Sequence, residues 1–215
     1  MLDITNLWLF SLSVLLLSIT PGPDMAYVVG QSVVNGRRAG VISATGVALG
    51  SCTHAIASMV GLTALISASP LMFTLVKYMG AVYLMYLGGK MLLGSFAGKA
   101  AEGETSAPRN MQADLRSLLS KGFITTLTNP KVILFFISFF PQFVTPNGEH
   151  HAASFLILGM VYALIGFMTD ATFALLAGGA AGAVSQNRML QRLLDRIVGT
   201  AFIGLGIRLA LTRRM

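Results

Sequence analysis

The chain has little charge and a single cysteine. Charged residues make up 11% of its 215 residues, whereas a soluble domain usually carries about a quarter. Cys52 stands alone, which excludes an internal disulfide and any electron relay between two thiols. Hydrophobic residues account for 54% of the sequence. This composition predicts an integral membrane protein.

Acidic residues are especially scarce. Eight Asp and Glu residues stand against 15 Lys and Arg residues, which gives a formal net charge of +7. An excess of positive charge can indicate nucleic-acid binding, but here the basic residues lie between apolar runs. Basic residues in such places contact the anionic lipids of the cytoplasmic leaflet. We therefore expect membrane lipids as partners, and no nucleic acid.

Apolar runs of about 20 residues, long enough to cross the hydrocarbon core, recur along the chain. The first run follows Asp3 and has no basic segment before it, so it is a retained span rather than a signal peptide. The pattern predicts an all-α protein with about six transmembrane helices, at residues 6–34, 40–66, 71–93, 119–143, 153–177 and 197–211.

Two of these spans contain residues that break a helix. Proline removes a backbone donor and interrupts the helical ladder, and proline after a capping residue is a normal helix start. Each break should therefore end one half-helix and begin another inside the membrane. The first break holds Pro21, Gly22, Pro23 and Asp24, and the second holds Asn129, Pro130 and Lys131.

The two halves of the chain resemble each other. Residues 77–84 match residues 196–203 in a pattern of a basic residue, a glycine and an aromatic residue, and each half begins with a broken span. Because three spans are an odd number, the second copy enters the membrane upside down, as in secondary transporters. We assign residues 1–94 to the first repeat, 95–117 to a cytoplasmic linker and 118–215 to the second repeat.

Lys and Arg residues in the short loops predict the orientation. They occur at 37–38, in the linker and at 185–196, but not at 67–70, at 145–151 or before the first span. Basic loops stay in the cytoplasm, so the N-terminus should lie outside. Arg213 and Arg214 break this pattern unless the last segment re-enters the membrane.

The broken spans predict a receptor for a zwitterion. Helix N-termini at Pro23 and Pro130 would direct free N–H groups and positive dipole ends at one region, which suits a carboxylate. Asp24 would take an ammonium group, and Lys131 would strengthen the carboxylate site. The alternative is that Asp24 and Lys131 neutralise each other, because buried ionisable groups usually pair.

Two further residues are candidates for proton coupling. Asp170 lies within the fifth span, where an unpaired carboxylate favours its protonated form, as a proton carrier requires. A hydrogen-bonded acid near the interface is the alternative for Asp170. His54 lies in the second span, where a histidine is more often a helix-contact residue than a relay.

Several motifs together resemble one family. Pro21-Gly22-Pro23-Asp24, the Gly46-x-x-x-Gly50 helix, residues 77–92, Asn129-Pro130-Lys131 and Phe140-Pro141-Gln142-Phe143 are similar to those of the LysE/RhtB family of amino-acid exporters. The resemblance implies a multi-pass protein of the bacterial inner membrane that exports amino acids by using the proton gradient. We expect a transporter rather than an enzyme, with no cofactor and no metal. It does not identify the amino acid, because members that share these motifs export basic, small neutral and branched amino acids.

Two other functions are compatible with parts of the pattern. A metal-cation exporter would use His54, Asp24 and Asp170 as ligands, but the sequence has no Cys-x-x-Cys and no His-rich tract, and Lys131 would repel a cation. An intramembrane aspartyl protease would use Asp24 and Asp170 as its dyad, but neither lies in a Gly-x-Gly-Asp motif. Six short spans form a thin wall around a central site, which makes a homodimer plausible.

Overall fold

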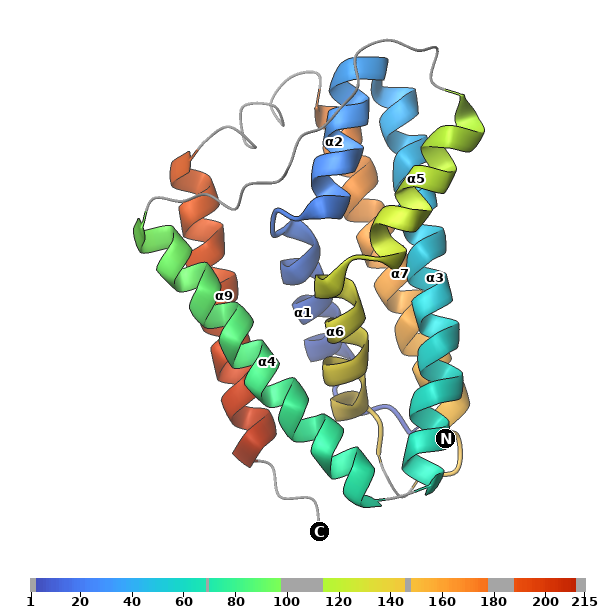
Figure 1. The fold of residues 1–215 in the computed structure, drawn as a ribbon, viewed down its shortest axis with the longest axis vertical. Coiled ribbons are helices and arrows are strands. Elements are labelled where there is room, and N and C mark those ends of the chain that lie inside the picture. Colours follow the sequence, from blue (N-terminus) through green and yellow to red (C-terminus); the bar gives the residue numbers. More distant parts are fainter. Residues whose placement is uncertain (1–2, 69, 98–113, 146–147, 178–187, 212–215) are drawn as a thin grey trace.

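The structure is a computed structural model, and it describes residues 3–68, 70–97, 114–145, 148–177 and 188–211 (Figure 1). Over these ranges the chain forms eight α-helices and one 3-10 turn, which confirms the predicted all-α architecture. The elements are α1 (Leu7–Ile19), α2 (Pro23–Asn35), α3 (Arg37–Ala68), α4 (Pro70–Ala97), α5 (Leu115–Leu127), α6 (Pro130–Phe139), η1 (Phe140–Phe143), α7 (His151–Leu176) and α9 (Arg188–Leu211).

Both predicted helix breaks are confirmed. The axis bends by 54° between α1 and α2 and by 51° between α5 and the helix that begins at Pro130. At each break the residue before proline is extended: Gly22 has φ −165° and Asn129 has φ −71° with ψ 109°. Proline disfavours the α-conformation at the residue before it and then starts a helix at its own fixed φ. The bends therefore follow directly from the local sequence.

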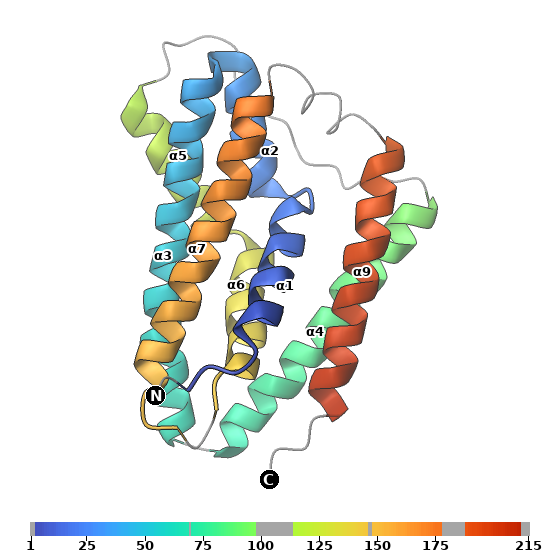
Figure 2. The same cartoon turned by 180° about the vertical axis from the view of Figure 1, so that it is seen from behind.

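The two halves of the chain run in opposite directions. In Figure 1, α1 and α2 rise from the end that carries the N-terminus, whereas α5 and α6 descend toward that end. The corresponding helices of the two halves pack together, α3 along α7 and α4 along α9 (Figure 1 and Figure 2). This arrangement is the one expected of inverted repeats.

The helices have the dimensions of membrane spans. By length and composition α3 and α7 can each cross a membrane, and each bent pair can form one more span. The remaining two, α4 and α9, contain 28 and 24 residues. At 1.5 Å per residue even α9 is about 36 Å long, which exceeds a hydrocarbon core of about 30 Å.

Glycines permit the closest contacts between these helices. A side chain at Gly46 of α3 or at Gly122 of α5 would collide with the backbone of the facing helix. In the other pair, Gly88 of α4 packs against Gly199 of α9. Small residues are the usual means of close helix packing in lipid, where apolar side chains gain little from contact with one another.

Several predicted helix boundaries were wrong. The loop expected at 35–38 shrinks to Gly36, whose φ of 87° is a left-handed conformation that suits glycine. The loop expected at 185–196 is helical from Arg188 onward. Helix also enters the expected linker from both sides, up to Ala97 and from Leu115, and residues 98–113 lie outside the described part. Arginine is a good helix former, so helices continue past the apolar runs that marked the spans.

The segment before α1 is joined to the segment around the start of α7. Thr5 N–H donates to the Phe143 carbonyl at 2.8 Å, and Thr145 N–H donates to the Asp3 carbonyl at 2.8 Å. The Asp3 carboxylate accepts from His150 N–H at 2.6 Å. These bonds tie the two halves together at the end that the loop charges place outside the cell.

The predicted orientation can be tested with single cysteines in a Cys52→Ser background. We expect Glu149→Cys to react with a membrane-impermeant maleimide added to intact cells, because Glu149 is exposed at the end that the loop charges predict to lie outside. Asn35→Cys, which is exposed near the other end of the molecule, should react only after the membrane is opened. Labelling of both cysteines from the same side would contradict the topology.

Candidate functional site

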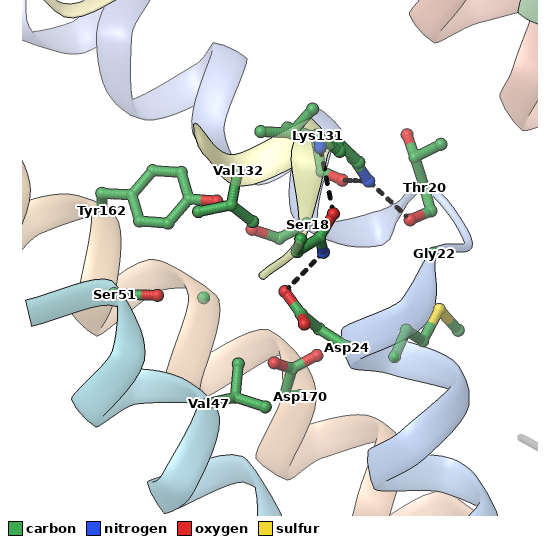
Figure 3. A pocket seen from close by; sticks show the side chains of 14 residues that line it. Ser18, Thr20, Gly22, Asp24, Val47, Ser51, Lys131, Val132, Tyr162 and Asp170 are labelled. Carbon is green, nitrogen blue, oxygen red and sulfur yellow. Dashed lines mark hydrogen bonds between the residues drawn. The ribbon is translucent and has the colours of Figure 1, made fainter. Parts of the chain in front are cut away.

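A small cavity lies where the two helix breaks meet. It measures about 40 Å³ and is lined by residues of α1, α2, α3, α6 and α7 together with both breaks. Of the site residues predicted from the sequence, five line it, and Figure 3 shows several of them around the cavity. These five are Gly22, Asp24, Asn129, Lys131 and Asp170.

Asn129 connects the second break to the first. Its side-chain N–H donates to Asp24 Oδ2 at 3.0 Å, while its Oδ1 accepts from the Lys131 backbone N–H at 3.0 Å. The side chain is 3% exposed. Asn129 therefore caps α6, as its sequence position predicted, and also holds the acid at the start of α2, which the sequence did not predict.

Lys131 makes another connection from the second break to the first. Its Nζ donates to the carbonyls of Leu17 at 2.9 Å and Thr20 at 3.1 Å, at the end of α1 (Figure 3). The last carbonyls of a helix have no partner within the helix, and a cation there also interacts favourably with the helix dipole. Two side chains of the second break thus hold the first break.

Asp24 and Lys131 do not form a direct ion pair in the described structure. The two charges attract each other across the cavity, but the hydrogen bonds of Lys131 go to backbone carbonyls and that of Asp24 goes to an amide. Direct neutralisation, the alternative considered from the sequence, is therefore not the contact observed. The positive and negative groups remain separate inside one cavity.

One oxygen of Asp24 is buried without a hydrogen bond. Among the described residues, Oδ1 has no hydrogen-bond partner, although Oδ2 is bonded to Asn129. The Thr126 side chain is near enough to interact with the carboxylate, but its hydroxyl lacks hydrogen-bond geometry. A buried acceptor in this state costs about 1–3 kcal/mol. This oxygen is therefore available to a hydrogen-bond donor of a bound ligand.

Asp170 brings a second carboxylate to the cavity. It is 5% exposed, and Figure 3 shows its side chain directed toward Asp24. The two acids interact electrostatically, so two negative charges repel each other there. Tyr162 and Gly166 precede Asp170 by eight and four residues on α7, and both line the cavity. Tyr162 was missed from the sequence, although its helical spacing from Asp170 could have indicated it.

The other predicted site residues lie around the cavity rather than in its lining. The His54 ring nitrogen is 3.2 Å from the Thr126 carbonyl, and its ring lies beside Phe136. Pro21, Pro23 and Pro130 shape the two breaks. Over the described ranges no three His, Cys, Asp or Glu residues are grouped to hold a metal ion, so the ligand set suggested for a metal exporter does not assemble there.

Aromatic side chains fill the core on one side of the site. Phe135 and Phe139 of α6 stack with ring centroids 4.4 Å apart, and Phe136 stacks on Phe140 at 4.2 Å. Phe10 of α1 packs edge-on against Phe140 at 5.2 Å. Such pairs add to the burial of apolar area. They fix α6 against α1 between the cavity and the end that carries the N-terminus.

Comparison with known proteins identifies relatives along nearly the whole chain. The sequence model of the LysE type translocator matches residues 15–213. An uncharacterized membrane protein of Pseudomonas aeruginosa is 36% identical over 97% of this chain and 96% of its own length. The leucine efflux protein of Enterobacter is 32% identical over 96% of both chains, and that of Salmonella typhimurium is 31% identical over 96% of this chain and 95% of its own. No solved structure matches.

Proposed function

Because this chain belongs to the LysE type translocator family, we propose that it exports neutral amino acids such as leucine from the cytoplasm in exchange for protons. Family membership makes it a multi-pass membrane transporter rather than an enzyme. The names of the leucine efflux proteins, at 31–32% identity, support the substrate class. The bacterial relatives support a location in the inner membrane.

The observation that carries the proposal is the buried, unbonded Oδ1 of Asp24. An amino acid has an ammonium group, and a carboxylate oxygen that is already desolvated binds such a group strongly. Asp170 adds a second negative charge on the same side of the cavity (Figure 3). We therefore assign the ammonium of the substrate to Asp24, with Asp170 nearby.

The substrate carboxylate has a complementary site at the first break. Lys131 Nζ lies beside Gly22, since a Cβ built on that glycine would be 3.5 Å from it. Gly22 is the N-cap of α2 and supplies no side-chain cap, so the first N–H groups of α2 can bind an anion. A lysine ammonium thus lies beside the helix N-terminus whose first turn also carries Asp24. This is the charge pattern of a zwitterion.

The cavity must widen when substrate binds. A cavity that binds benzene measures about 150 Å³, whereas this one measures about 40 Å³. The half-helices are the parts that can move, because each is attached to its neighbour through a break instead of a continuous ladder. We propose that they separate on one side of the membrane at a time, so that the site opens to the cytoplasm and to the outside in turn.

We propose that the two carboxylates couple transport to protons. A proton on either Asp24 or Asp170 removes their mutual repulsion, and an ammonium group bound beside them does the same. The proton and the ammonium group of the substrate therefore compete for the same pair of carboxylates, as an antiporter requires. We assign the proton to Asp170, with His54 as a second candidate because it interacts electrostatically with Asp24.

Transport by purified protein in proteoliposomes tests the function. We expect leucine loaded on one side to drive counterflow of labelled leucine, whereas lysine and aspartate should compete poorly because their charged side chains would meet the apolar part of the lining. Equal counterflow of all three, or counterflow of none, would contradict a neutral amino-acid exporter.

A double variant separates a receptor from a structural pair. Asp24→Asn can still accept from Asn129, and Lys131→Gln keeps a side-chain N–H donor near the carbonyls that end α1, so the double variant should fold, which its melting temperature checks. If the charges hold the ends of the substrate, its apparent affinity for leucine should fall by about 30-fold or more. Lys121→Gln, an exposed change, is the control. Normal affinity in a stable double variant would show that the charges only hold helices.

Asp170→Asn tests the proton site, because it keeps the shape of the side chain but removes its titration. We expect this variant to exchange leucine at equilibrium while losing the acceleration that a pH gradient gives the native protein. Glu149→Gln removes an exposed acid outside the cavity lining and should retain that acceleration. If the Asp170→Asn protein still responds normally to the gradient, Asp170 is structural.

A further inference from the structure

One face of α7 presents an aromatic ring, a glycine and an acid to the cavity. Tyr162, Gly166 and Asp170 are spaced four residues apart, so they lie on one face of the helix, and all three line the cavity. Tyr162 and Asp170 are buried there. Gly166 therefore leaves a hollow in the wall between a ring and a carboxylate.

Close packing does not require the glycine at this position. A Cβ built on Gly166 would meet only Ser18 Oγ, at 4.0 Å, which is an ordinary contact. Two turns earlier, a Cβ on Gly159 would collide with Ala55 of α3. Glycine is also one of the poorest helix formers, so neither packing nor helix propensity accounts for Gly166. The absence of a side chain at Gly166 enlarges the cavity.

Apart from the charged groups, several of the residues around this hollow are apolar. Leu17, Met25, Val47 and Val132 line the same cavity. When the ammonium and carboxylate groups of a substrate are held between the two breaks, its side chain contacts these apolar residues. We propose that Gly166 is the specificity-determining residue that sets the largest aliphatic side chain accepted, an inference that rests on the proposed function.

The wall that carries Gly166 is the rigid part of the site. On one side of Gly166 along α7, Gly159 is packed against Ala55, and on the other side Ala174 is packed against Gly40. Contacts this close leave little freedom for α3 and α7 to move apart. When the half-helices separate to admit substrate, Gly166 thus keeps its place, and the space above it continues to limit the side chain.

The test compares small and large substrates in proteoliposomes. Counterflow of labelled alanine and labelled leucine is measured for the native protein, Gly166→Ala, Gly166→Val and a control, Gly61→Val, whose Cβ would meet no atom within 4 Å. For Gly166→Val we expect the leucine-to-alanine ratio of rates to fall by about tenfold or more, the usual effect of occupying space in an apolar pocket. Gly166→Ala should shift the ratio in the same direction by less, and the control should keep the native ratio.

The outcomes separate this inference from the proposed function. If the native protein carries leucine and alanine but both Gly166 variants leave the ratio unchanged, or lose both rates equally, then Gly166 does not set substrate size. If the native protein carries no amino acid, the proposed function fails and this inference fails with it. Because alanine favours helix and meets no clash at this position, Gly166→Ala remains a folded probe even if the valine variant is unstable.

Discussion

Helix breaks inside a membrane expose backbone carbonyl and N–H groups that lipid cannot satisfy, and this structure depends on how they are satisfied. Lys131 from the second break bonds the carbonyls that end α1. Asn129 caps α6 and holds Asp24 at the start of α2. The same bonds that complete the backbone therefore join the two halves of the chain at their centres. They also position opposite charges around a cavity without letting them meet.

This arrangement explains why one oxygen of Asp24 stays unbonded. Lys131 would be its obvious partner, but Lys131 is engaged by the end of α1. The resulting cost of about 1–3 kcal/mol is small beside the packing of the aromatic residues on α1 and α6, where Phe10, Phe135, Phe136 and Phe139 are at most 2% exposed. The packing of the aromatic core thus offsets the cost of the unbonded Asp24 oxygen. A ligand that supplies a cation recovers the lost bond.

The breaks could be predicted from the sequence because proline acts locally, and so could the all-α inverted arrangement, because apolar runs and repeated motifs are visible in the chain. The bonds between the breaks could not be predicted, since they depend on how the two halves dock. Lys131 was expected to face Asp24 or a ligand, and its contact with the carbonyls of Leu17 and Thr20 has no sequence signal. The start of α9 at Arg188 was missed because hydropathy marks only the lipid-facing part of a helix.

The central claim is that an amino acid binds between the two breaks with its ammonium on Asp24. A structure of the purified protein with leucine bound tests it most directly. We expect the leucine nitrogen within hydrogen-bond distance of Asp24 Oδ1 and its carboxylate beside Lys131 and the N-terminus of α2. Leucine bound elsewhere in the protein, with Asp24 and Lys131 joined in a direct ion pair, would contradict the account.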